Sequence, residues 1–259
     1  MSIKVARLVA GVIGVLLVWS ALAAVVQSGD DPLAQAKLPF PHQLVELIIE
    51  QREALVEASW LTLQQALIGF VIGSLVGALF AVIVAQATWM EAGFIPLLLA
   101  AQMVPMIALV PVMQNIFRND DLVRIFISAF ITFFSVTVAV ARGMKTVRPE
   151  AYELAASYNA SRVDLLRRVQ LPSAVPMLFT GLRVAAPLSI VGSVLVDFAG
   201  AQSGLGYIMV AAITIGSNGS MIVWAAMLIL LALGFLLTLG VTLLERLVAP
   251  WQLAKTEGN

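Results

Sequence analysis

The chain has 259 residues, of which 61% are hydrophobic and only 12% are charged. Soluble domains carry about 25% charged residues, so the composition excludes an ordinary water-soluble protein. Fifteen basic and fifteen acidic residues give zero net charge, which provides no basis for a nucleic-acid partner, and the lack of cysteine excludes disulfide and thiolate chemistry. The sequence therefore predicts a membrane protein.

Several apolar stretches reach the length of about 20 residues that a helix needs to cross a bilayer. The predicted spans are Val5–Val26, Leu61–Ala85, Phe94–Phe117, Leu122–Ala141, Met177–Phe198 and Ile222–Val248. The first follows Lys4 like a signal peptide, but its length and the later spans favour a retained helix. The third is interrupted by Pro96, Pro105 and Pro111, and we expect such a helix to line a cavity where the freed carbonyls find partners.

The segments between the spans contain further helical patterns. The loop at 28–60 contains an amphipathic helix that we expect to lie at the membrane interface, with apolar positions Leu44, Leu47, Ile48 and Leu55. The segment Gly200–Ser220 is too short to span and predicts a re-entrant or interfacial helix. In the second span the spacing of four between Gly69, Gly73 and Gly77 allows close helix packing, which we expect within the chain rather than at a dimer contact.

The distribution of basic residues predicts the orientation. With the N-terminus inside, eleven Lys and Arg residues lie near the cytoplasmic ends of spans and four lie outside. We expect a multi-pass protein of the plasma or inner membrane with both termini cytoplasmic. Its predicted organisation is a first transmembrane helix (1–27), an outer loop with an amphipathic helix (28–60), a five-helix core (61–248) that includes a long connection (145–172), and a cytoplasmic tail (249–259).

The connection Lys145–Pro172 predicts two short helices. Pro149 suits the first position of a helix that reaches about Tyr158, with Tyr152, Ala155 and Ala156 on one side. Asn159 is a left-handed terminator, and Ser161 caps a second helix that Leu171–Pro172 is expected to end. Two to eight residues suffice to join two helices, so this connection is oversized. It is either a docking surface or a hairpin that its arginines hold to anionic lipid.

This stretch resembles the EAA loop of permease subunits in ATP-binding-cassette importers, whose pattern is roughly E-A-A-x3-G-x9-I-x-L-P. The matching positions here are Glu153, Leu154, Ala155, Asn159, Val169, Leu171 and Pro172. Leu154 replaces an alanine and Asn159 replaces the glycine, and asparagine still permits the left-handed turn. The pieces Pro176-x4-Gly181-Leu-Arg183 and Gly204-Leu-Gly206-Tyr207 are similar to the sulfonate, taurine, nitrate and pyrimidine-precursor branch of that family. The resemblance covers roughly 60–251.

The resemblance implies an all-α polytopic fold of about six transmembrane helices, like a type I importer permease, with a cytoplasmic helical hairpin. Two permease chains, identical or paralogous, form the pathway, and an extracytoplasmic solute-binding protein delivers the solute. Cytoplasmic ATP-binding subunits carry the ATP and magnesium, so this chain holds no cofactor and no metal and is not itself an enzyme. The implied coupling residues are Glu153, Ala155, Ala156, Asn159, Ala160, Leu166, Leu171 and Pro172. In agreement, the sequence contains no G-x4-G-K-[ST] motif for binding ATP.

Polar side chains inside spans are expensive and therefore mark a candidate pathway. The candidates are Gln102, Met106, Gln114, Ser135, Ser189, Ser193 and Asp197. The serines either line the pathway or bond back to their own helix. Asp197 is either a gate or solute contact or an interface-level acid that faces water. We expect Arg183 to reach the membrane surface or the hairpin.

Two other classes of membrane protein fit the sequence less well. An intramembrane protease needs a Ser–His pair, an H-E-x-x-H motif or two carboxylates within the spans. The one histidine, His42, lies in the outer loop, the motif is absent, and Asp197 is the only acid embedded in an apolar run. A proton-coupled secondary carrier using Asp197 would leave the hairpin without a purpose. The solute stays open between a sulfonate, nitrate, a pyrimidine precursor and a flavin.

Overall fold

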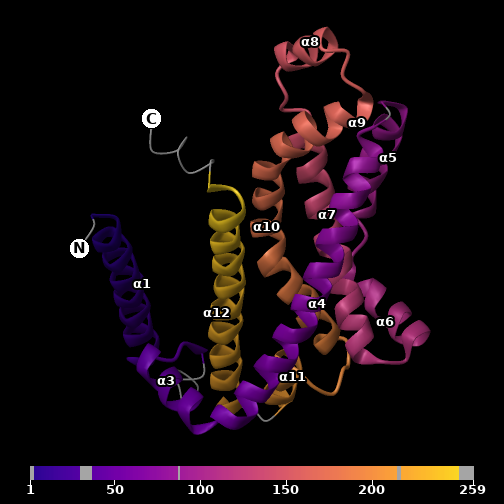
Figure 1. The fold of residues 1–259 in the computed structure, drawn as a ribbon. Coiled ribbons are helices and arrows are strands. Elements are labelled where there is room, and N and C mark those ends of the chain that lie inside the picture. Colours follow the sequence, from indigo (N-terminus) through magenta and orange to yellow (C-terminus); the bar gives the residue numbers. More distant parts are fainter. Residues whose placement is uncertain (1–2, 30–36, 87, 215–216, 251–259) are drawn as a thin grey trace. The chain divides into compact units, whose positions relative to one another are not determined.

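Figure 1 shows the computed structural model, which describes residues 3–29, 37–86, 88–214 and 217–250. These residues form helices and contain no strand. The chain divides into two compact units, Met1–Leu61 with Gln202–Leu231 and Thr62–Ala201 with Ala232–Asn259. The predicted tail lies outside the described residues from position 251 onward.

The helices follow one another with short connections. They are α1 (Ile3–Gln27), α3 (Pro41–Glu50), α4 (Arg52–Val84), α5 (Thr88–Ala101), α6 (Met106–Phe117), α7 (Asp120–Met144), α8 (Pro149–Ser157), α9 (Arg162–Leu165), the π-helix η1 (Leu166–Gln170), α10 (Leu171–Phe198), α11 (Leu205–Thr214) and α12 (Ser217–Val248). Among the described residues, five helices are long and apolar enough to span a membrane, or six if the bent pair α5–α6 is one span. This confirms the predicted all-helical fold with about six spans.

The interruption in the third predicted span is sharper than a kink. Helices α5 and α6 meet at 90° across residues 102–105. Pro105 has no N–H to continue α5, and its φ of −60° and ψ of 112° make it the residue that precedes the first turn of α6. Pro96 and Pro111 lie inside the two helices. The segment is therefore a broken span or a re-entrant loop.

In the unit that contains the N-terminal helix, α1 is tied to the start of α3. The Nε1 of Trp19 donates to the Pro39 carbonyl at 2.9 Å, and the Nε2 of Gln27 donates to the Leu38 carbonyl at 2.9 Å. The extent predicted for the amphipathic helix is wrong. Helix α3 ends at Glu50, Gln51 has non-helical dihedral angles (φ −102°, ψ 22°), and Leu55 belongs to α4. Helix α11 has 10 residues, too few to span, as predicted.

In the other unit, α7 packs closely against both α4 and α10. A Cβ atom added at Gly69 would lie 2.5 Å from the Ser128 Cβ, and one at Gly73 would collide with the Ala129 carbonyl oxygen. Against α10, a Cβ added at Gly181 would lie 2.6 Å from the Ala139 Cβ. The glycine ridge therefore serves packing within the chain, as predicted, because only glycine lets the backbones approach this closely.

Candidate functional site

Helix α8 projects beyond the ends of α7 and α10 in Figure 1. Pro149 occupies its first turn after an extended Arg148. The helix ends at Asn159, whose φ of +51° is left-handed, and the Ala160 N–H donates to the Ala155 carbonyl at 2.9 Å. This is the helix-ending turn that the sequence predicted.

The second helix of the hairpin begins as predicted and ends differently. The Ser161 Oγ accepts a hydrogen bond from the Asp164 N–H at 3.1 Å, which confirms the predicted cap. The Leu171–Pro172 pair does not end the helix, so that prediction is wrong. The chain widens into the π-turn η1, in which the Leu171 N–H donates to the Leu166 carbonyl, and then continues as α10. The wider turn gives the Pro172 ring room that an α-helical turn would deny it.

The two faces of α8 differ in exposure. Leu154 is 59% exposed and Tyr158 is 79% exposed, and their spacing of four places them on one face. Ala155 is half-buried, and the hydroxyl of Tyr152, also half-buried, accepts a hydrogen bond from the Gln170 Nε2 at 3.4 Å. The exposed apolar face therefore centres on Leu154 and Tyr158 rather than on the expected side of Tyr152 and Ala155. We call Leu154 and Tyr158 the docking face.

The other predicted coupling residues fall into two groups. Glu153, Ala156, Asn159 and Ala160 are exposed on the hairpin. Leu166 packs against the core formed by α7 and α10, and Leu171 and Pro172 line a cavity beneath the hairpin. The motif thus combines a surface with the residues that support it.

Buried charges join α7 to α10. The Arg124 Nε lies 2.7 Å from the Asp197 Oδ1, with both side chains fully buried, and the Arg124 Nη1 lies 2.8 Å from the Asp121 Oδ1. Asp197 is therefore not the water-facing acid considered from the sequence. The sequence places Arg124 within the predicted span Leu122–Ala141, and the orientation rule counts it among the four basic residues on the outer side. Its position four residues into α7 was the available signal that it could be buried.

Polar groups continue along the same face of α10, and Asp197, Ser193 and Ser189 recur at a spacing of four. The Ser128 Oγ donates to the Ser189 carbonyl at 2.7 Å. Within the part of the chain that the structure describes, the buried hydroxyls of Ser193 and Thr132 have no hydrogen-bond partner. We call this set of buried polar residues the polar seam; it consists of Arg124, Ser128, Thr132, Ser189, Ser193 and Asp197.

The remaining pathway candidates are dispersed. Gln102 is exposed at the bend and Met106 begins α6. The Gln114 Nε2 donates to the Asp120 Oδ1 at 3.3 Å, and the Ser135 Oγ donates back to the Ile131 carbonyl at 3.4 Å. The structure therefore brings together Ser189, Ser193 and Asp197 but not the other four.

Arg183 pairs with a residue of α12, and its side chain is 38% exposed, so its expected position at the membrane surface or the hairpin stays a prediction. Its Nη1 lies 2.8 Å from the Oε2 of Glu245 on α12, a partner 62 residues away that sequence reasoning missed. In the described ranges, no group of three or more His, Cys, Asp or Glu side chains is placed to hold a metal ion.

Comparison with known proteins gives a consistent result. Residues 62–250 match the family described as "Binding-protein-dependent transport system inner membrane component". The chain is 29% identical to a probable ABC transporter permease protein of Haemophilus influenzae, over 92% of this chain and 95% of the relative. It is 31% identical to the formylaminopyrimidine transport permease protein of Halalkalibacterium halodurans, over 83% and 86%. The crystal structure of an amino acid ABC transporter with histidines shares the fold, with a TM-score of 0.59 at 16% identity over 77% of this chain and 94% of that chain.

Proposed function

We propose that the α8–α9 hairpin docks a separate ATP-binding subunit. The chain belongs to the family of binding-protein-dependent transport system inner membrane components, and the proposal starts from that membership. Family membership makes the chain a multi-pass permease component of an ABC importer for small nutrients. Permeases of this family work with ATP-binding subunits and solute-binding proteins. Docking at the hairpin is the step by which ATP hydrolysis on the partner would drive solute across the membrane.

The docking face carries this proposal. Leu154 and Tyr158 are large apolar side chains on a helix that projects beyond the packed spans, and exposed apolar groups of this kind mark interaction sites. The shape of the hairpin is supported by the left-handed turn at Asn159, the Ser161 cap and the hydrogen bond from Gln170 to Tyr152. Its second helix, α9, continues through η1 into α10, which suits the transfer of motion from a partner.

The proposal includes the orientation and the other partners. Both termini and the hairpin face the cytoplasm, a second permease chain completes the pathway, and a solute-binding protein delivers solute at the opposite face. ATP and magnesium bind on the ATP-binding subunits. The candidate pathway runs beside the polar seam. Both serines of α10 in the seam, Ser189 and Ser193, are buried in this structure, and the Ser189 Oγ donates back to the Ala186 carbonyl at 2.8 Å. Ser193, whose hydroxyl has no hydrogen-bond partner among the described residues, is therefore the preferred position that a rearrangement would expose to solute.

For the solute we propose a weakly polar heterocycle of the pyrimidine-precursor class. Arg124 balances Asp197, and Arg183 balances Glu245, so these charges are committed to the protein rather than to an oxyanion. The relative from Halalkalibacterium halodurans is named for formylaminopyrimidine transport. In membrane vesicles loaded with the complete transporter, labelled formylaminopyrimidine should be taken up in an ATP-dependent manner and taurine should not; the reverse result would reject this solute class.

The docking proposal is tested by co-purification with the ATP-binding subunit. Leu154→Asp and Tyr158→Asp should each abolish co-purification while membrane insertion is retained, because a carboxylate would enter an apolar contact. Ser157→Asp is the matched control, since it adds the same charge to an exposed position of α8 that is not among the implied coupling residues. If both docking-face variants still bind the ATP-binding subunit as wild type does, the docking assignment is wrong.

A further inference from the structure

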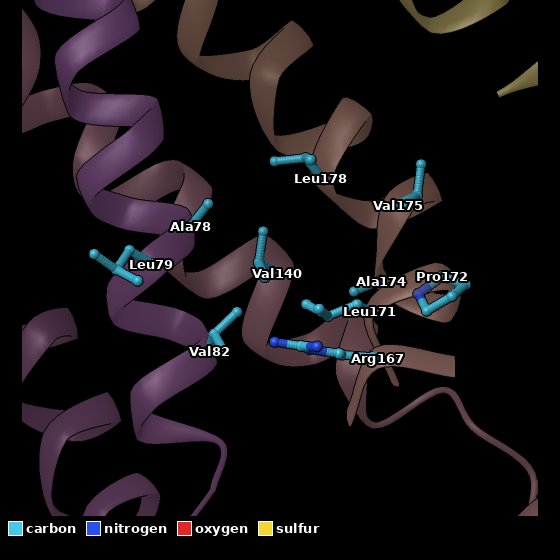
Figure 2. Close-up of a pocket in the computed structure, with 10 residues that line it drawn as sticks. All are labelled: Ala78, Leu79, Val82, Val140, Arg167, Leu171, Pro172, Ala174, Val175 and Leu178. Atoms are coloured by element: carbon cyan, nitrogen blue, oxygen red, sulfur yellow. The ribbon is translucent and has the colours of Figure 1, made fainter. Parts of the chain in front are cut away.

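A cavity of about 460 Å³ lies beneath the hairpin and is lined by residues of α4, α7, η1 and α10. Nine of its ten lining side chains are apolar, and the tenth is Arg167 of η1. Figure 2 shows the Arg167 guanidinium pointing across the cavity toward Val82 of α4 and Val140 of α7. Cavities of this size commonly hold a ligand or part of one.

The cavity lies at the level where the apolar spans end. On α4 its lining residues stop at Val82, four residues before Gln86, and on α7 Val140 lies two residues before Arg142. The first charged or amide side chains after an apolar span mark the boundary between hydrocarbon and headgroups. Leu79, which lines the cavity, is 63% exposed on a membrane-spanning helix, so the cavity has an apolar rim that opens toward the bilayer.

Arg167 differs from its neighbour in its partners. Arg168 Nε lies 3.4 Å from the Asp164 Oδ1, whereas the guanidinium of Arg167 makes no hydrogen bond or ion pair with any residue that the structure describes. An unpaired guanidinium beside apolar walls complements a ligand with one anionic group and one long apolar part. Basic pockets between spans on the cytoplasmic side bind anionic lipid headgroups.

We propose that this cavity binds one anionic phospholipid from the inner leaflet, with its phosphate on Arg167 and an acyl chain between α4, α7 and α10. A free phosphate would leave the apolar walls unused, and in a zwitterionic lipid the phosphate already has the cation of its own headgroup as a counter-charge, which weakens its attraction to Arg167. Because Arg167 belongs to η1 and Leu171 and Pro172 also line the cavity, the lipid would contact the joint between the hairpin and α10.

The test uses the permease purified with its ATP-binding subunits, observed by native mass spectrometry with added phosphatidylglycerol or phosphatidylcholine. Wild type should retain one phosphatidylglycerol per permease chain in preference to phosphatidylcholine. Arg167→Gln should weaken phosphatidylglycerol binding roughly fivefold, the contribution of one basic side chain at an anionic membrane surface, and Arg167→Lys should restore most of it. Arg168→Gln is the matched control and should bind as wild type does.

Two further measurements separate the other possible occupants. Val175→Phe, which puts a larger side chain into the cavity lining, should weaken the binding of lipid with either headgroup, and glycerol phosphate should fail to displace phosphatidylglycerol. A photo-crosslinking side chain at Leu79 should label phospholipid. The proposal is overturned if Arg167→Gln and Val175→Phe retain lipid as wild type does, if glycerol phosphate competes, or if the Leu79 crosslink joins a second permease chain or the ATP-binding subunit.

Discussion

Asp197→Asn is expected to destabilise the packing of α7 against α10. The neutral amide cannot balance the guanidinium of Arg124, which is 0% exposed and would stay charged inside the protein. Breaking a buried ion pair by removing one partner costs about 3–5 kcal/mol. Because the Asp121 Oδ1 remains 2.8 Å from the Arg124 Nη1, we expect the lower end of that range, about 3 kcal/mol.

The measurement is the free energy of unfolding in detergent micelles, followed by tryptophan fluorescence during chemical denaturation. Asp121→Asn is the matched control, because it removes a carboxylate from the same arginine at a site that is 52% exposed, where an ion pair contributes under about 1 kcal/mol. The double variant Arg124→Met with Asp197→Leu removes both buried charges and should recover most of the lost stability.

Comparison of these variants shows whether the buried ion pair stabilises the packing of α7 against α10. If Asp197→Asn lowers the free energy of unfolding no more than Asp121→Asn does, the buried pair does not hold α7 to α10. If the double variant is less stable than Asp197→Asn, the ion pair contributes more than the neutralisation of a buried charge. The explanation that Asp197→Asn destabilises the protein by leaving Arg124 buried and unbalanced is then wrong.

Three other predictions concern stability and docking. Gly73→Val should lower the free energy of unfolding by about 1–3 kcal/mol because the backbone of α7 occupies the space, whereas Gly14→Ala, with nothing within 4 Å of the added Cβ, should leave it equal or slightly higher. Asn159→Gly should keep the affinity for the ATP-binding subunit, and Asn159→Val should weaken it by about 1–2 kcal/mol because of the left-handed φ; titration of detergent-purified protein measures both. Glu245→Gln should change the unfolding free energy by less than about 1 kcal/mol, since its partner Arg183 is 38% exposed, and a larger loss in the same denaturation assay would show a stronger pair.

Features set by neighbouring residues were predictable from the sequence. The spans follow from apolar runs of sufficient length, and the start of α8 at Pro149 follows from the ring of proline. The turn at Asn159 and the cap at Ser161 depend on hydrogen bonds that reach at most five residues along the chain. Each of these preferences acts locally, so a single sequence contains the necessary information.

Features set by distant residues were not predictable. Arg124 and Asp197 are 73 residues apart, and counting basic residues by loop places Arg124 outside the membrane core. The face that α8 exposes, with Leu154 rather than Ala155, goes together with the hydrogen bond between Tyr152 of α8 and Gln170, 18 residues further along the chain. A proline inside a helical pattern predicts an end to the helix, whereas Pro172 follows the widened turn η1 and lies in the first turn of α10.

The widened turn at η1 also has a mechanical consequence. Residues 162–198 form one run of 37 helical residues, whose contour is about 55 Å at 1.5 Å per residue. No loop along this rod can absorb a displacement applied at the hairpin end. The π-turn and the two inner prolines, Pro176 and Pro187, are the joints at which it can flex, because each interrupts the regular ladder of hydrogen bonds. A displacement that passes through the turn at 158–161 and reaches Arg162 is therefore expected to bend this run at one of these joints or to load its far end, where Asp197 is paired with Arg124.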